Sequence, residues 1–195
     1  KEMTNLTKET IMTRISAVEH ETATGKTKDL LDGVKAKLGF APNLMKTFAN
    51  SPAALEAYLG FNATLGKTLN AKLREEIALI TAEQNGCGYC ASAHTALGKA
   101  AGMSDDETIA ARRGVGSDNK KTAALTFAKA ILEKRGSVSD DELAEIRSAG
   151  YTDGEITEIV SHVALNVLTN YFNNLAETEI DFPVVSVPLS RSAAI

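Results

Sequence analysis

The residues of this chain that are best suited to chemistry lie together in residues 85–94. This stretch holds both cysteines of the protein, Cys87 and Cys90, and one of its three histidines, His94. If a helix begins near Cys87, these three side chains are spaced i, i+3 and i+7 and share one face. A helix N-terminus favours a thiolate, and a neighbouring imidazole lowers the thiol pKa further or carries its proton. Two thiols, one to attack and one to resolve, are what reversible peroxide or disulfide chemistry requires.

A zinc site is one alternative use of the same residues. A structural zinc needs four ligands. Cys87, Cys90 and His94 supply three, and His162 or His20 could supply the fourth. The sequence contains no second Cys-x-x-Cys and no His-x-x-x-His, so this alternative is less favoured than redox chemistry.

Two further alternatives use the cysteines differently. A Cys–His acyl-transfer enzyme needs only one cysteine, and a second one three residues away would be an oxidation hazard. Two buried structural cysteines that never react are also open, because free cysteine packs like a small hydrophobic residue. However, Gly86 and Gly88 remove bulk on both sides of Cys87, which favours access over packing. Redox chemistry is therefore the preferred interpretation.

Three glutamates precede the cysteine pair, and each could relay protons to it: Glu75, Glu76 and Glu83. A charged residue on a helix is most often simply solvated. In one unbroken helix, Glu76, Glu83 and Cys87 would share a stripe, which favours Glu76. Because Asn85-Gly86 is expected to interrupt that helix, the spacing alone does not choose among the three.

The sequence predicts an all-α fold. Helical periodicity recurs from about Lys26 onward with short Gly, Asn or Ser-Asp breaks, and no stretch alternates convincingly enough to form a sheet. Ser104–Glu107 and Ser139–Glu142 are capping boxes. The expected organisation is an N-terminal arm over residues 1–25, a single helical domain over 26–185, and an extended C-terminal tail over 183–195 that is rich in valine and proline.

Composition and charge exclude several classes of partner. The 195 residues are 44% hydrophobic and 24% charged with a net charge of −4, so nothing indicates nucleic acid or an anionic membrane as a partner. There is no apolar run of about 18 residues, as a membrane span would need. Residues 1–13 lack the apolar core of a secretory signal, and two cysteines make no secreted-type disulfide framework. A cytoplasmic location is therefore expected.

The residues around the cysteines resemble the AhpD-like superfamily, which joins the carboxymuconolactone decarboxylases to the alkylhydroperoxidase AhpD proteins. The pattern Glu-x11-Cys-x2-Cys-x3-His is specific, and the likeness covers most of the chain, from roughly residue 26 to 185. The segments that carry it are Leu73-Arg74-Glu75-Glu76-Ile77, Asn85-Gly86-Cys87-Gly88-Tyr89-Cys90, Ala93-His94, Ser104-Asp105-Asp106-Glu107, Arg147-Ser148-Ala149-Gly150-Tyr151, Val163-Ala164-Leu165-Asn166, Thr169-Asn170-Tyr171-Phe172-Asn173 and Thr178-Glu179-Ile180-Asp181-Phe182-Pro183.

The resemblance implies an AhpD-like helical fold with an internally duplicated core and a homo-oligomer, commonly a trimer or hexamer. A weak internal similarity points the same way, since Leu73–Ile77 and Thr152–Ile156 superpose at an offset of 79 residues. The CxxC-bearing half would span about residues 26–116, and a degenerate half about 117–182. In the second half, Asn173 stands where His94 stands in the first. The second half would therefore lack the chemistry, and we expect it to serve as scaffold and oligomer surface.

The resemblance also implies a peroxidase activity that needs no metal or other cofactor but does need a hydroperoxide substrate and an external thiol reductant. By motif, Cys90 would attack the peroxide oxygen, Cys87 would resolve it as a disulfide, His94 would shuttle the proton, and Glu75 would support it. AhpD itself has Ser-His between the cysteines where Gly88-Tyr89 stands here, which matches the peroxidase-related members and leaves the substrate and reductant open. A redox-responsive oligomeric scaffold and a carboxymuconolactone decarboxylase-type enzyme remain alternatives, although such decarboxylases generally lack the cysteine pair.

Overall fold

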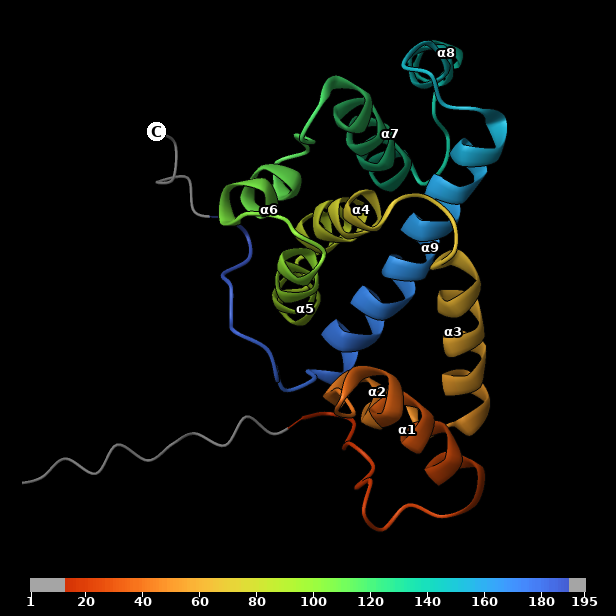
Figure 1. The fold of residues 1–195 in the computed structure, drawn as a ribbon, viewed down its shortest axis with the longest axis vertical. Helices are drawn as coiled ribbons and strands as arrows, with labels where there is room; N and C mark the ends of the chain where they lie inside the picture. The colour runs from red at the N-terminus through yellow and green to blue at the C-terminus, as the bar shows by residue number, and fades with distance from the viewer. Residues whose placement is uncertain (1–12, 190–195) are drawn as a thin grey trace, which may run out of the picture.

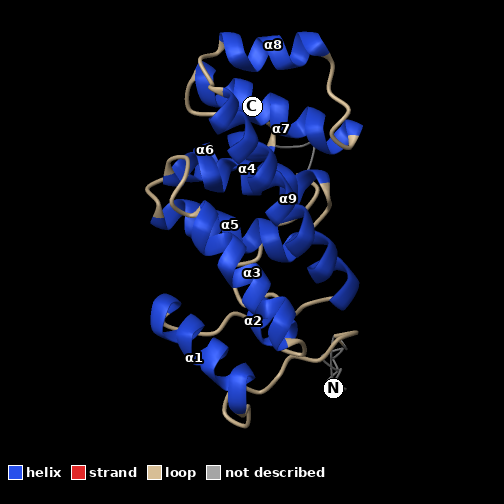
Figure 2. Ribbon diagram, turned by 90° about the vertical axis from the view of Figure 1, so that its right-hand side faces the viewer, coloured by secondary structure: helices blue, strands red, loops and turns tan. Residues whose placement is uncertain are grey.

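The computed structural model describes residues 13–189, so residues 1–12 of the predicted arm and 190–195 of the predicted tail lie outside the described part. Within residues 13–189 the secondary structure consists of helices joined by loops, with no strand (Figure 2), and the predicted all-α class is confirmed. The helices are α1 Gly25–Leu38, α2 Asn43–Phe48, α3 Pro52–Leu65, α4 Ala71–Gln84, α5 Gly88–Ala100, α6 Asp105–Arg112, α7 Asn119–Lys134, α8 Asp140–Ser148 and α9 Asp153–Ala176. None of the helices in this range is both long and apolar enough to cross a lipid bilayer.

Helix α4 lies at the centre of the molecule and contacts α5, α6, α7 and α9 (Figure 1). Eight of its fourteen residues are buried, namely Leu73, Glu76, Ile77, Ala78, Leu79, Ile80, Thr81 and Ala82. A helix that is buried on most of its circumference needs apolar residues all round rather than one stripe, and this run supplies them. Side chains on α4 are consequently held between neighbouring helices.

Apolar cores lie toward both ends of α4. One is formed mainly by α4 with α7, α8 and α9, and includes Ile77, Leu125 and Ile159. The other joins α1 and α2, at the lower end of Figure 2, to the first turn of α5, and it contains both cysteines. The cysteine pair therefore belongs to a packed core rather than to a surface loop.

The sequence Asn85-Gly86 ends α4 and aims the chain into α5. Gly86 has a left-handed backbone (φ +64°), which glycine adopts without the steric penalty of a Cβ. The Cys87 N–H donates to the Ala82 carbonyl (2.9 Å) and the Gly86 N–H to the Glu83 carbonyl (3.2 Å), the two bonds of a Schellman C-cap. The predicted interruption is thus real, and Cys87 follows directly as the N-cap of α5.

Helix starts read from capping motifs agree with the structure. Complete capping boxes begin α6 at Ser104, α8 at Ser139 and α9 at Thr152, each with a glutamate at the third helical position. The predicted duplication, in contrast, is not shown. At an offset of 79 residues the break between α4 and α5 would fall at residues 164–166, yet α9 runs without interruption through that point.

Residues 177–189, called here the C-terminal strap, leave α9 and run beside α5 toward α6 (Figure 1). The strap contains neither helix nor strand, and its Ile180, Phe182, Val185 and Val187 pack on the core that holds the cysteines. Polar contacts hold it in register, because the Val185 N–H donates to Ser92 Oγ (3.1 Å). The strap therefore covers the first turns of α5.

Tyr89, between the two cysteines, fastens the strap to α2. Its hydroxyl donates to Asp181 Oδ1 (2.8 Å) and accepts from the Leu44 N–H (3.1 Å). The other Asp181 oxygen accepts from the Asn43 N–H at the start of α2 (2.7 Å). One side chain thereby joins α5, α2 and the strap.

Replacing Tyr89 by Phe tests this link. Loss of the hydroxyl leaves the Leu44 N–H and one Asp181 oxygen without a partner, so we expect the free energy of unfolding to fall by about 1–3 kcal/mol. Urea denaturation measures it. Tyr171→Phe is the matched control, since Tyr171 is 62% exposed and a surface change should stay within about 0.5 kcal/mol. Equal stability of the two variants would show that the link contributes nothing.

Candidate active site

The two cysteines lie at the N-terminus of α5 and are both free thiols. Cys87 is the N-cap and is 0% exposed, and Cys90, at the third helical position, is 2% exposed. The Cys90 N–H donates to Cys87 Sγ (3.2 Å), so a sulfur takes the place that a serine or aspartate oxygen usually has at a helix start. The two side chains are therefore held on the same turn, as a dithiol that forms a disulfide requires.

His94 and Glu75 form the second part of the site. His94 lies one turn after Cys90 on α5, and its Nδ1 is 2.7 Å from Glu75 Oε2 on α4. Their side chains are 23% and 20% exposed. Because a carboxylate on Nδ1 fixes the ring and leaves Nε2 for other partners, the pair is arranged as a proton carrier.

The surroundings set the two thiols apart in acidity. Burial acts to raise the pKa of Cys90, but the hydrogen bond from Cys87, the charge of His94 and the amides of Asn173 and Asn170 outweigh it and lower the pKa to about 7. The same hydrogen bond to Cys90, with burial second, raises the pKa of Cys87 above its ordinary value. Cys90 is therefore the thiol that ionises first.

The pKa of His94 is raised, which complements the lowered pKa of Cys90. Burial acts to lower its pKa, but the charge and hydrogen bond of Glu75, followed by the charge of Cys90, raise it overall. The imidazolium form is thus favoured beside a thiolate, and each charge stabilises the other.

Helix α9 adds two asparagines to the site. The Asn173 Nδ2 donates to Cys90 Sγ (3.2 Å), and Asn173 and Asn170 are both buried. The second half of the chain was expected to act only as scaffold, and this expectation missed the amide contact. The aligned position of Asn173 was visible in the sequence, but its contact with Cys90 depends on how α9 packs across α4 and α5.

A small cavity of about 60 Å³ opens beside the His94–Glu75 pair. Its lining comes from α3, α4, α5 and α9, with Gly66 between them, and comprises Tyr58, Asn62, Gly66, Arg74, Glu75, Ala78, His94, His162, Leu165, Asn166 and Thr169. The Arg74 guanidinium is anchored by the carbonyls of Thr68 (3.0 Å) and Leu69 (2.7 Å). Larger hollows exist, one of about 330 Å³ between α7 and α8, but they are lined by neither cysteine nor His94.

Tyr58 and Arg74 were not predicted as site residues, and His162 was considered only as a zinc ligand. Burial, with the nearby charges of Cys90 and Glu75, raises the pKa of Tyr58, so its hydroxyl stays protonated. Burial and the charge of Arg74 lower the pKa of His162, whose Nε2 lies 3.2 Å from Thr68 Oγ1. A lone tyrosine on an apolar helix gives no signal in the sequence that it faces a reactive centre.

Of the three glutamates that could serve the thiols, only Glu75 bonds to His94. Glu83 instead takes two hydrogen bonds from Arg112 (2.9 and 2.7 Å) and one from the Leu189 N–H of the strap (2.7 Å). The α4 stripe that favoured Glu76 fails because the chain turns at Gly86 before α5 begins.

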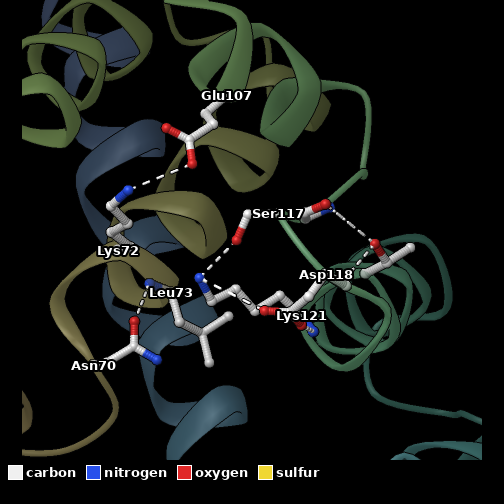
Figure 3. Close-up of polar contacts among 9 residues, drawn as sticks. Asn70, Lys72, Leu73, Glu107, Ser117, Asp118 and Lys121 are labelled. Atoms are coloured by element: carbon white, nitrogen blue, oxygen red, sulfur yellow. Dashed lines mark hydrogen bonds and ion pairs between the residues drawn. The ribbon is translucent and has the colours of Figure 1, made fainter. Parts of the chain in front are cut away.

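Glu76 faces the segment between α6 and α7. It is 1% exposed, and burial raises its pKa while Lys121 and the Ser117 N–H act to lower it. Figure 3 shows this region, in which Lys121 Nζ donates to Ser117 Oγ (2.7 Å). Neither Glu76 nor Glu83 forms a hydrogen bond to a cysteine or to His94.

The residues named for a zinc site are dispersed. His20 pairs with Asp32 of α1 (2.7 Å), and His162 with Thr68. Within residues 13–189 no three His, Cys, Asp or Glu side chains are grouped so that they could hold a metal ion.

Comparison with known proteins agrees with this fold. Residues 52–134 match the model of the carboxymuconolactone decarboxylase family. Comparison with curated protein sequences finds no match. The geometry and the match define an all-α protein of AhpD-like fold with a buried dithiol. Over residues 52–134 the chain is similar to the carboxymuconolactone decarboxylase family, and its overall fold is AhpD-like.

Three solved structures illustrate the fold. A peroxidase-related protein with an alkylhydroperoxidase AhpD core from Ralstonia eutropha JMP134 has a TM-score of 0.78 and 22% identity, over 87% of this chain and 92% of that one. A peroxidase-related protein from Silicibacter sp. TM1040 has a TM-score of 0.76 and 23% identity, over 88% and 94%. A variant of the debrominase Bmp8, in complex with 2,3,4-tribromopyrrole, has a TM-score of 0.74 and 21% identity, over 88% and 93%.

Thiolate absorbance against pH tests the acidity of the pair. We expect the reduced protein to ionise one thiol near pH 7, and Glu75→Gln to move this midpoint upward. The sign follows because loss of the Glu75 charge lowers the pKa of His94, and a neutral His94 no longer favours the Cys90 thiolate. Glu56→Gln on exposed α3 is the control and should leave the midpoint in place. An unchanged midpoint in Glu75→Gln would contradict this account.

Proposed function

We propose that this protein reduces hydroperoxides through a dithiol–disulfide cycle of Cys90 and Cys87. The observation that carries the proposal is the asymmetry of the pair: a buried thiol with a pKa of about 7 lies beside a second thiol whose pKa is raised. Attack on the peroxide needs a thiolate, and the second thiol gives up its own proton only when it attacks the sulfenic acid and water leaves. The dithiol supplies both at neutral pH.

The first step transfers one oxygen to sulfur. The Cys90 thiolate attacks the terminal oxygen of the hydroperoxide, the O–O bond breaks, and the sulfur becomes a sulfenic acid, Cys90–SOH. The alkoxide or hydroxide that leaves takes a proton from the His94 imidazolium and departs as an alcohol or water. Glu75 then holds a neutral imidazole that can be protonated again from solvent.

The second and third steps return the enzyme to its starting state. Cys87 sulfur attacks Cys90–SOH, an S–S bond forms, and water leaves. A dithiol reductant then reduces the disulfide to two thiols while it is itself oxidised to a disulfide. Electrons and atoms balance with one hydroperoxide and one dithiol consumed per cycle.

The cavity beside His94 supports a small peroxide. Its volume of about 60 Å³ compares with the roughly 10–15 Å³ of cavity volume that one water molecule needs. Hydrogen peroxide or a short organic hydroperoxide fits this space, whereas a lipid hydroperoxide would require Tyr58 or α3 to move.

Cysteine variants test the order of attack. Cys90→Ser is expected to abolish peroxide consumption, because serine offers no thiolate. Cys87→Ser is expected to consume one equivalent and stop at a sulfenic acid, since the resolving thiol is missing. Stopped-flow peroxide consumption with mass spectrometry of a trapped sulfenic acid measures both. The reverse pattern, with single turnover in Cys90→Ser, would assign the attack to Cys87.

Replacing His94 by Gln tests the proton donor. General acid catalysis contributes about 10²–10⁴-fold, so we expect the rate constant for sulfenic acid formation to fall by about 100-fold or more. His20→Gln, which loses only the contact with Asp32, is the matched control and should react as the wild type does. Equal rates in the two histidine variants would remove His94 from the reaction.

The alternatives predict other outcomes. In a redox-responsive scaffold, oxidation would change the oligomeric mass without turnover, so mass measurements on reduced and oxidised protein separate it from a peroxidase. A carboxymuconolactone decarboxylase-type enzyme would keep its activity after loss of both cysteines. Assembly as a trimer or hexamer, and the identity of the reductant, stay predictions from the family resemblance.

A further inference from the structure

We propose that Asn170 and Asn173 form a binding site for the oxygen atom that Cys90 takes up. The inference rests on the proposed function and goes beyond it, because it assigns a step of the chemistry to helix α9, from which neither cysteine nor the histidine comes. It makes the site a composite of α4, α5 and α9.

Each of the two asparagine amides has one polar atom that forms no hydrogen bond in the folded protein. Asn170 Nδ2 and Asn173 Oδ1 are buried and have no hydrogen-bond partner among the described residues. Asn170 is 0% exposed and Asn173 is 3% exposed. Asn173 nevertheless touches the sulfur through its Nδ2 (3.2 Å), and the amide of Asn170 is near enough to lower the pKa of Cys90.

The orientation of Asn170 is fixed from outside the site. Asn85 Nδ2 donates to Asn170 Oδ1 (3.0 Å), which leaves the NH₂ end of the Asn170 amide for the cysteine side. Asn85 is itself held, because its carbonyl accepts from Asn174 Nδ2 (2.9 Å). The turn that ends α4 therefore sets the direction in which Asn170 donates.

One free donor and one free acceptor match the hydrogen bonding of a sulfenic acid. In Cys90–SOH the oxygen can accept from Asn170 Nδ2–H, and its hydrogen can be donated to Asn173 Oδ1. The same two atoms suit the terminal HO group of a hydroperoxide before attack. In the reduced protein that oxygen is absent, which accounts for the two unsatisfied atoms at one place in the core.

Such an arrangement stabilises the product of the first step relative to the starting thiolate. Buried polar atoms without partners destabilise the reduced protein, and this penalty is relieved when the sulfur gains its oxygen. Preorganised donors at the position of a transferred atom also lower the barrier, because they need no reorientation during the reaction. The asparagines are thus positioning residues for the oxygen rather than proton carriers.

The test uses full-length Cys87→Ser protein as the parent, so that the sulfenic acid accumulates. Asn170→Leu, which keeps the branched shape of the side chain, and Asn173→Ala are added to it. Hydrogen peroxide is the probe, and the sulfenic acid is trapped and quantified by mass spectrometry over time. Every rate is measured at a pH where thiolate absorbance is complete, which removes effects on thiol ionisation.

We expect both variants to form the sulfenic acid about tenfold more slowly or worse, and to lose it faster to overoxidation. The melting temperature of Asn170→Leu should change little, since removal of the unsatisfied Nδ2 offsets loss of the hydrogen bond that Oδ1 accepts from Asn85 Nδ2. Tyr171→Phe is the control on the same helix: Tyr171 is 62% exposed and lies outside the proposed oxygen site, so this variant should behave as the parent does.

Other outcomes overturn the inference in distinguishable ways. If the asparagine variants match the Tyr171→Phe control once the thiolate is fully formed, the amides act on acidity alone, and the oxygen site is wrong while the proposed function stands. If the parent itself forms no sulfenic acid, the proposed function fails and this inference fails with it. Asn170→Asp, which keeps the shape but replaces the donor, gives the same comparison if the leucine variant does not fold.

Discussion

The left-handed turn at Gly86 is the constraint on which this site depends. The turn lies one residue before Cys87, and it makes Cys87 the N-cap of α5. Any other direction of the chain would separate Glu75, on α4, from His94, on α5. The same turn places Asn85 beside Asn170 of α9. Residues of α4, α5 and α9 therefore come together at the Cys90 site because Asn85-Gly86 ends α4. A side chain at position 86 would be strained whatever space surrounds it.

The charges of the site form a compact set in which the Cys90 sulfur is buried and the His94 and Glu75 side chains are only partly exposed. A thiolate at Cys90 and an imidazolium at His94 would each be unfavourable in a packed core, but together with the Glu75 carboxylate they leave a net charge of only −1. Amide dipoles from α9 and the N-terminus of α5 share that charge. The low dielectric of the interior strengthens each of these contacts, so that even a neutral side chain such as Asn173 helps to lower the pKa of Cys90.

Local features of the fold could be predicted from the sequence, and remote packing could not. Capping boxes at Ser104 and Ser139 and the break at Asn85-Gly86 are encoded within a few residues, so the helices were found. The spacing of Cys87, Cys90 and His94 also sufficed to place them on one face at the start of a helix. The choice of Glu75 over Glu76 needed the family pattern, because a rotation of one residue on a central helix changes which neighbour it meets. The contact of Asn173 with Cys90 joins positions 83 residues apart and has no local signal.

The strap has a consequence for recycling that differs from its role in stability. Ile180 lies so close to the start of α5 that a Cβ on Gly88 would be 3.7 Å from it, and Cys87 is wholly covered. The cavity beside His94 has room for only a few water molecules, and a reductant of protein size would have to displace residues 177–189 to reach Cys87. In the proposed cycle, reduction of the disulfide by a protein would therefore wait for a local opening of the strap, which the Tyr89–Asp181 contact opposes.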